Sequence, residues 1–226
     1  MGKTLAEVDT QLRELIGDYQ RTNFSQSAVT EAINWAQDLV MRRKGFKVDG
    51  YLYPISGYPT GALPSTSLDT KRVQLVTPTT LVYAPLPSTG DDDVVIRILD
   101  ESTMVHEDAA NELWRSQRTA YLPRRWTLIG NQKFTIVPPI LPVSAPSYAV
   151  RVYVVSMATR VVAPTDPIDP AIPNYYQEAL RYAAAAYLME KDTDLKSMQL
   201  KGEMMKSFEY HMSGEIPTLA VTEQDS

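Results

Sequence analysis

The sequence predicts an α+β fold in which N- and C-terminal helices form one bundle around a β-rich insertion, followed by an extended C-terminal tail. The first observation is that 15 of the 16 prolines lie between Pro54 and Pro173, because proline is excluded from helix interiors and central strands. The second is the helical spacing of apolar residues on either side of that region. The third is the alternation of apolar residues within it.

These observations divide the chain into four parts. We expect core helices at 1–50, the β-rich insertion at 51–165, further core helices at 166–214 and the extended tail at 215–226. The chain has 226 residues, 44% of them hydrophobic, which suits one large domain or a domain with a sizeable insertion.

Composition and charge exclude several classes of function. The net charge of −5 argues against a dedicated nucleic-acid binder, which normally carries a basic excess. The chain has no cysteine, so disulfides, thiolate metal sites and cysteine catalysis are excluded. The first residues are charged, without a signal-peptide core, and no window approaches the roughly 18 apolar residues of a membrane span. We therefore expect a soluble protein, made in the cytoplasm, with no membrane partner.

The N-terminal region predicts two helices. Thr4 and Glu7 form a capping-box sequence, and Gly17 suits the end of the first helix. The second helix is expected to begin near Ser25 or Ser27 and to end in three cations, which suit the negative end of the helix dipole. Its predicted buried stripe consists of Val29, Ile33, Ala36 and Val40.

The middle region predicts strands with short connections. Alternation is clearest at Tyr148–Met157, and a hairpin is expected around Gly130. One short helix is predicted at 108–118, and the density of Pro, Gly, Ser and Thr at 54–68 predicts a long loop or arm. The other predicted strands are Val73–Val76, Leu81–Ala84, Val94–Leu99, Trp126–Ile129 and Lys133–Val137.

The C-terminal region predicts two more helices. The first is expected over 173–190, with Pro173 in its first turn, where the missing N–H costs nothing. The acids at 192–194 break the pattern and can cap the second helix. The predicted buried stripe of the first helix is Ile172, Tyr176, Ala179, Leu180, Ala183, Tyr187 and Leu188. That of the second is Leu195, Met198, Gly202, Met205, Phe208 and Met212.

No residue pattern points to catalysis, a metal or a cofactor. His106 stands beside two acids, but residues adjacent in sequence do not face each other on a helix, so an acid-rich helix start is the simpler interpretation. The acids in 89–93 lack the spaced ligands of a calcium loop and favour a turn before a strand. Nucleotide-binding, zinc-protease and serine-hydrolase motifs are absent. We expect a protein that is not an enzyme.

The order of parts resembles one known family. A capped helix precedes FSQSAVTEAINWAQDLV, and the middle carries PRRWTLIGNQKFTIVPP and then YAVRVYVVSMATRVV. A proline-rich linker leads to IPNYYQEALRYAAAAYLMEKDTDLKSMQLKGEMMKSFEYHM. This arrangement is similar to that of the head-to-tail adaptor (connector, or head-completion) proteins of tailed bacteriophages, over most of the chain.

The resemblance implies a structural virion protein at the head–tail interface. Such adaptors form a ring, usually dodecameric, that docks under the portal protein and extends the DNA ejection channel. Their lower face meets the tail nozzle or the next tail component, and duplex DNA passes through without specific binding. They catalyse nothing, and their C-terminal segment commonly reaches the portal.

Two groups of residues are candidates for protein contacts. Tyr175, Tyr182 and the run Ala183, Ala184, Ala185 and Ala186 combine amphipathic rings with small side chains that let helices approach closely. Two interpretations stay open for this group: contact with a neighbouring subunit, or packing inside the bundle. In the tail, Ile216, Leu219 and Val221 are predicted to anchor an extended peptide on the portal, the alternative being a frayed terminus.

Two other classes of function remain as alternatives. The chain could be a cytoplasmic ligand- or carbohydrate-binding β module with helical flanks. It could also be a carboxylate-based enzyme, because paired carboxylates leave no local sequence signature and the chain has 27 acids.

Overall fold

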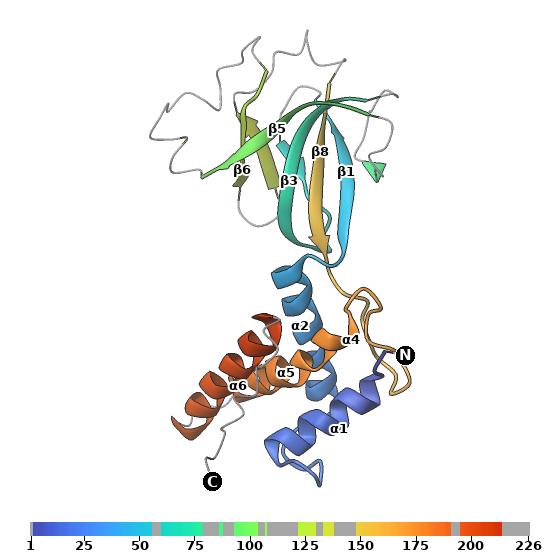
Figure 1. Ribbon diagram of the computed structural model, residues 1–226, viewed down its shortest axis with the longest axis vertical. Helices are drawn as coiled ribbons and strands as arrows, with labels where there is room; N and C mark the ends of the chain where they lie inside the picture. The colour runs from blue at the N-terminus through green and yellow to red at the C-terminus, as the bar shows by residue number, and fades with distance from the viewer. Residues whose placement is uncertain are drawn as a thin grey trace, which may run out of the picture. The chain divides into compact units, whose positions relative to one another are not determined.

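The computed structural model describes residues 2–55, 60–78, 86–87, 93–103, 107, 122–129, 133–137, 148–190 and 195–213. The chain divides into two compact units. A helical unit consists of Met1–Lys44 and Ala158–Ser226, and a sheet unit of Gly45–Met157 (Figure 1). The predicted α+β class, with a β-rich insertion between N- and C-terminal helices, is confirmed.

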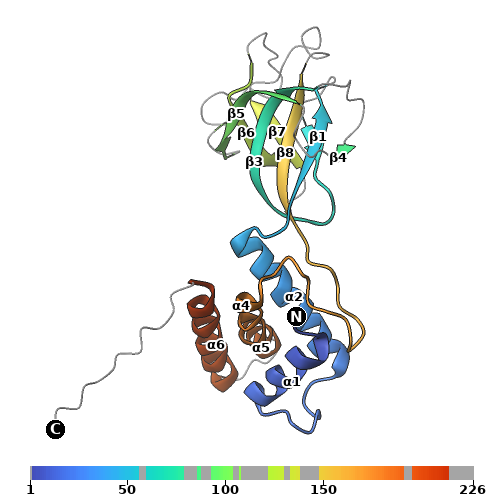
Figure 2. The same ribbon diagram turned by 45° about the vertical axis from the view of Figure 1, so that its right-hand side comes forward.

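The helical unit is organised around helix α5 (Ala179–Glu190). The helices are α1 (Leu5–Ile16), α2 (Gln26–Lys44), α4 (Asn174–Gln177), α5 (Ala179–Glu190) and α6 (Leu195–Ser213). Helix α5 packs against α1, α2 and α6, so C-terminal helices pack on N-terminal ones (Figure 2). Among the described residues, no helix has both the length and the apolar character that a membrane crossing needs.

The N-terminal helices begin and end where their capping residues predict. Thr4 Oγ1 accepts from the backbone N–H of Glu7 at 3.4 Å, and the Glu7 carboxylate accepts from the Thr4 N–H at 2.7 Å. That backbone hydrogen bond lowers the pKa of Glu7. Helix α1 ends at Gly17, whose φ of 72° is left-handed. Ser25 precedes α2 and accepts from the N–H of Ala28 at 3.2 Å. The predicted stripe of α2 is fully buried.

Two predictions for the C-terminal helices are wrong. The segment 173–190 is not one helix, because α4 is a single turn that ends before Glu178 and α5 begins at Ala179. The predicted stripe of α6 is only partly buried: Phe208 and Met212 are buried, whereas Met198 is 61% exposed and Gly202 is also exposed. Ser197, which was not predicted, is buried as well. The small polar Ser197 occupies a position that hydrophobic periodicity assigns to the outer face.

The described residues of the sheet unit form one mixed sheet of eight strands. The strands are β1 (Val48–Pro54), β2 (Thr60–Ala62), β3 (Ser67–Thr77), β4 (Leu86–Pro87), β5 (Val94–Ser102), β6 (Arg125–Ile129), β7 (Lys133–Val137) and β8 (Ala149–Ser156). Their order is β2-β7-β6-β5-β3-β8-β1-β4. All neighbours are antiparallel except β5 and β6, which are parallel.

The sheet curves so that strands far apart in its order share one core. The rings of Tyr53 on β1 and Phe134 on β7 meet edge to face, with centroids 4.9 Å apart. Tyr53 also donates a hydrogen bond to the Ala62 carbonyl at 2.9 Å, and burial raises its pKa to about 12. The same core contains Trp126 and alternate residues of the central strands, among them Val152.

Most strand predictions are confirmed, and two segments differ. Strand β1 lies where no strand was predicted, and the predicted loop at 54–68 contains β2 and the start of β3. Gly61 explains part of this error: it pairs opposite Phe134, and a Cβ there would collide with the Phe134 ring. A glycine that reads as a loop signal is therefore required inside a strand. The predicted strand Leu81–Ala84, helix 108–118 and hairpin turn at Gly130 lie outside the described residues.

Candidate interaction surfaces

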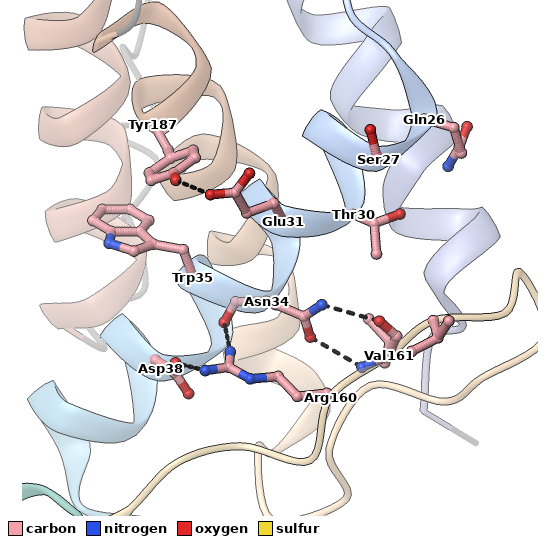
Figure 3. A pocket seen from close by; sticks show the side chains of 11 residues that line it. Gln26, Ser27, Thr30, Glu31, Asn34, Trp35, Asp38, Arg160, Val161 and Tyr187 are labelled. Atoms are coloured by element: carbon pink, nitrogen blue, oxygen red, sulfur yellow. Dashed lines mark hydrogen bonds and ion pairs between the residues drawn. The ribbon is translucent and has the colours of Figure 1, made fainter. Parts of the chain in front are cut away.

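The connector 158–173, which follows β8, is bound along the helical unit by side chains. Asn34 on α2 makes two hydrogen bonds with Val161, donating to its carbonyl at 3.0 Å and accepting from its N–H at 3.0 Å. The Asp38 carboxylate accepts from the Ala158 N–H at 3.0 Å, and pairs with Arg160 at 2.8 Å. Figure 3 shows Asn34, Asp38 and Arg160 gathered where α2 meets the connector. The connector is therefore fixed in place, although it has no regular secondary structure over most of its length.

The connector also completes the start of α1. The N–H groups of Leu5 and Ala6 donate to the carbonyls of Asp166 and Pro164, at 2.9 and 3.0 Å. These are first-turn donors, which have no partner inside a helix. The Asp166 carboxylate accepts from the N–H groups of Val162 and Ala163, and these bonds lower its pKa. Connector and helix thus satisfy each other's backbone groups.

A groove of about 700 Å³ opens beside this connector. Trp35 and Tyr187 form an aromatic pair in it, with centroids 5.1 Å apart, and the Tyr187 hydroxyl donates to Glu31 at 2.6 Å. Val162, 78% exposed, lies at the rim. The complete lining is Gln26, Ser27, Thr30, Glu31, Asn34, Trp35, Asp38, Arg160, Val161, Val162 and Tyr187 (Figure 3). Aromatic side chains next to an exposed aliphatic residue on a hydrogen-bonded segment are typical of a protein-contact surface.

Replacing Asn34 with aspartate is expected to lower the free energy of unfolding by about 1–3 kcal/mol. The change keeps the acceptor for the Val161 N–H, but it removes the donor and places a carboxylate oxygen against the Val161 carbonyl. Asn23→Asp, at an exposed position, is the matched control. Urea denaturation followed by circular dichroism measures both. Equal stability of the two variants would contradict the anchoring role of Asn34.

A buried ionic network joins α1 to the segment before α2. Arg13 is 3% exposed and pairs with Asp9 and Asp18, each at 2.6 Å. Asp18 is 2% exposed and also accepts backbone N–H groups of the segment that follows, from Thr22 at 2.9 Å and Asn23 at 3.0 Å. Sequence reasoning missed this network. The only signal was the spacing of Asp9 and Arg13, which also fits an exposed helix pair.

The six residues predicted for helix or subunit packing separate into two sets. Ala183–Ala186 are buried by the chain itself, at 1% exposure or less. Tyr175 is 47% exposed and packs edge to face on Tyr176. Tyr182 is half-buried between helices, stacked on His211 at 5.0 Å and under the Arg181 guanidinium. A role for the tyrosines between subunits stays a prediction.

The remaining predicted residues are only partly described. Ile216, Leu219 and Val221 lie outside the described residues, as does His106, so the portal contact of the tail stays a prediction. Glu107, beside His106, is 2% exposed and pairs with Arg125 at 3.1 Å. In the described ranges, no cluster of three His, Cys, Asp or Glu residues has metal-site geometry.

The structure is that of an α+β protein whose helical unit carries an open groove. The family model described as SU10 adaptor protein matches residues 3–216. The chain belongs to the SU10 adaptor protein family, a family of phage adaptor proteins, and the resemblance seen in the sequence is confirmed. A search of curated proteins gave no match. Family membership assigns a structural role as a phage head–tail adaptor, located in the virion with virion partners.

Proposed function

We propose that the chain forms a dodecameric ring under the portal protein, joins head to tail and extends the DNA channel. The family match carries this proposal, because it spans residues 3–216 and so includes the helices of both termini and the sheet unit between them. The portal binds one face of the ring, and the tail nozzle or next tail component binds the other.

The helical unit supplies the features that a ring contact needs. A ring closes through a heterologous contact, in which two different faces of the same chain meet. The groove with Trp35 and Tyr187 is one candidate face, and the exposed rings of Tyr175 and Tyr210 offer contact area elsewhere on the unit. The alanines of α5 contribute by keeping the helices beneath these faces closely packed.

The charge of the chain suits a channel through which DNA slides. A wall that bound phosphates with many Lys and Arg residues would hold the duplex by releasing its counterions. The net charge of −5 supports passage without specific binding.

The C-terminal tail is proposed to anchor the ring on the portal through Ile216, Leu219 and Val221. An extended peptide that docks in a groove or on a sheet edge gains most of its affinity from a few apolar anchors. A chain that lacks residues 215–226 should therefore dock at least about tenfold more weakly, a loss of roughly 1.4 kcal/mol or more. Its melting temperature should be unchanged.

Purified portal rings test both parts of the proposal. Full-length chain should decorate portal rings in cryo-EM, and the truncated chain should show low occupancy at the same concentration. Thr218→Ala with Thr222→Ala, in the same tail, is the matched control and should dock normally. Failure of the full-length chain to dock on its portal would contradict the adaptor ring. Normal docking of the truncated chain would contradict only the role of the tail.

A further inference from the structure

The first half of β5 carries an unusual density of exposed aliphatic side chains. Val94 is 63% exposed, Val95 45%, Ile96 42% and Ile98 56%. Val94 and Val95 are adjacent and point to opposite faces of the sheet, so exposed aliphatic side chains lie on both faces. Ile96 is a bulge residue, because Arg97 pairs with Leu75 and Val95 with Val76. We call Val94–Ile98 the β5 ribbon. Isolated exposed aliphatic residues are ordinary, but a contiguous group of them marks an interaction site.

Among the described residues, one backbone edge of the β5 ribbon has no partner strand. Apart from the bulge residue Ile96, Val94–Leu99 pair with β3 on one side, whereas β6 pairs on the other side only with Asp100–Ser102. Within the described ranges, no strand pairs with the β6-side edge of the ribbon (Figure 1). Unpaired N–H and C=O groups on a sheet edge are a template for another strand, and natural edges are usually blunted by charge or proline. This edge carries one charged residue, Arg97.

Arg97 suggests the charge of the missing partner. Its side chain is exposed between Ile96 and Ile98, and it makes no hydrogen bond or ion pair with the described residues. Arg124 is also exposed and lies at the end of the ribbon, where its carbonyl accepts from the Asp100 N–H at 3.0 Å. A guanidinium among aliphatic side chains is best satisfied by a carboxylate, through paired charge-assisted hydrogen bonds.

The charges around the ribbon disfavour a second copy of the same strand. The antiparallel self-pairing centred on Ile96 places Val94 opposite Ile98 and Val95 opposite Arg97. It would place Asp100 opposite Asp92 and Glu101 opposite Asp91, and like charges directly opposite each other are destabilising.

We propose that the β5 ribbon is a docking edge for an extended segment of a different protein, which adds to the sheet as a strand and places a carboxylate opposite Arg97. Main-chain hydrogen bonds provide the affinity of such strand addition, and alternate side chains provide the specificity. The aliphatic residues of the partner cover the two exposed faces of the ribbon. This site lies in the sheet unit and does not depend on the ring proposed above.

Two synthetic peptides test the charge preference. Both alternate valine with threonine, and they differ only in a central glutamate or lysine. Backbone amide NMR shifts of the full-length chain locate binding, and titration measures affinity. The glutamate peptide should shift the amides of the β5 ribbon and bind at least about tenfold more tightly than the lysine peptide. Equal affinities, shifts confined to other strands, or no binding of either peptide would overturn the proposal.

Matched variants test whether the peptides bind at the β5 ribbon or elsewhere on the surface of the sheet. Arg97→Glu should reverse the preference between the two peptides, and Arg72→Glu, at an exposed arginine of β3, should leave it unchanged. Ile96→Lys should weaken both peptides, whereas Val48→Lys, at a residue of β1 that is 44% exposed, should not. Equal effects of a variant and its control would overturn the proposal. So would concentration-dependent dimerisation in sedimentation that Ile98→Lys abolishes, since the occupant would then be a second copy.

Discussion

Replacing Asp18 with alanine is expected to lower the free energy of unfolding of the helical unit by about 3–5 kcal/mol. The substitution leaves the guanidinium of Arg13, 3% exposed, with one carboxylate fewer in a site from which water is largely excluded. It also removes the acceptor for the backbone N–H groups of Thr22, Asn23 and Phe24, which order the connection between α1 and α2. Breaking a buried ion pair costs more than the pair contributes, because the remaining charge stays buried.

Urea denaturation of the full-length chain, followed by far-ultraviolet circular dichroism, measures this loss. Glu14→Ala is the control, because Glu14 is an exposed acid of the same helix and its removal should change stability by less than about 0.5 kcal/mol. A loss below about 1 kcal/mol for Asp18→Ala would show that the network is more hydrated than its burial indicates.

The pH dependence of the same variant gives an independent check. Burial raises the pKa of Asp18, but the backbone N–H groups of Asn23, Thr22 and Phe24, together with Arg13, outweigh burial and lower the pKa overall. A carboxyl group whose pKa is lower in the folded state than in the unfolded state stabilises the fold. Its full contribution is present at pH values above the unfolded pKa, near 3.9. That stability is lost as the pH falls through the lowered folded value. The difference in melting temperature between the natural chain and Asp18→Ala should therefore be constant near neutrality and narrow below about pH 4.

Replacing Ala184 or Ala185 with leucine is expected to destabilise the helical unit by about 1–3 kcal/mol. Both alanines are fully buried on α5, which packs against α1, α2 and α6. The larger side chain must displace a neighbouring helix, because a close-packed interior has no room for three extra carbon atoms.

Ala6→Leu is the matched control for this overpacking. Ala6 is exposed on α1, so the same change of side chain there meets solvent and should be nearly neutral. Thermal melting compares the three variants, and cryo-EM occupancy on portal rings then shows whether a destabilised helical unit still docks. Wild-type melting and docking for both α5 variants would contradict close packing around the alanine run.

The elements that sequence predicts best are those that local interactions determine. The capping box at Thr4, the left-handed Gly17 and the alternation of β8 each depend on residues within one turn or one strand. The misplaced elements depend on distant partners. Gly61 is in a strand because its backbone lies against Phe134, and β1 is ordered by full-length pairing with β8. No spacing within either segment carries that information.

The candidate surfaces likewise differ in whether neighbouring or distant residues of the chain form them. The alanine run of α5 is visible in the sequence, but only the structure shows that the chain itself buries it, since the sequence also allowed a contact with a neighbouring subunit. The groove is not visible, because it joins α2 to Val161 and Tyr187, residues more than a hundred positions away. Asn34 is an ordinary surface residue by periodicity, and only the connector packed beside it makes its amide a backbone anchor. The sequence predicts a strand at Val94–Leu99 but not the exposure of its first residues, since apolar sequence alone does not indicate what covers a strand.

The way in which the sheet unit begins and ends has an evolutionary consequence. Its first and last strands, β1 and β8, are paired along their whole length, and the Ser156 N–H donates to the Lys47 carbonyl at 2.9 Å. The two ends of the inserted segment therefore lie close together. Because pairing of β1 with β8 already holds these ends together, the helices bear no further entropic cost of closing the segment as a loop. Such a segment can be lengthened, shortened or exchanged for another module while the helices keep their contacts.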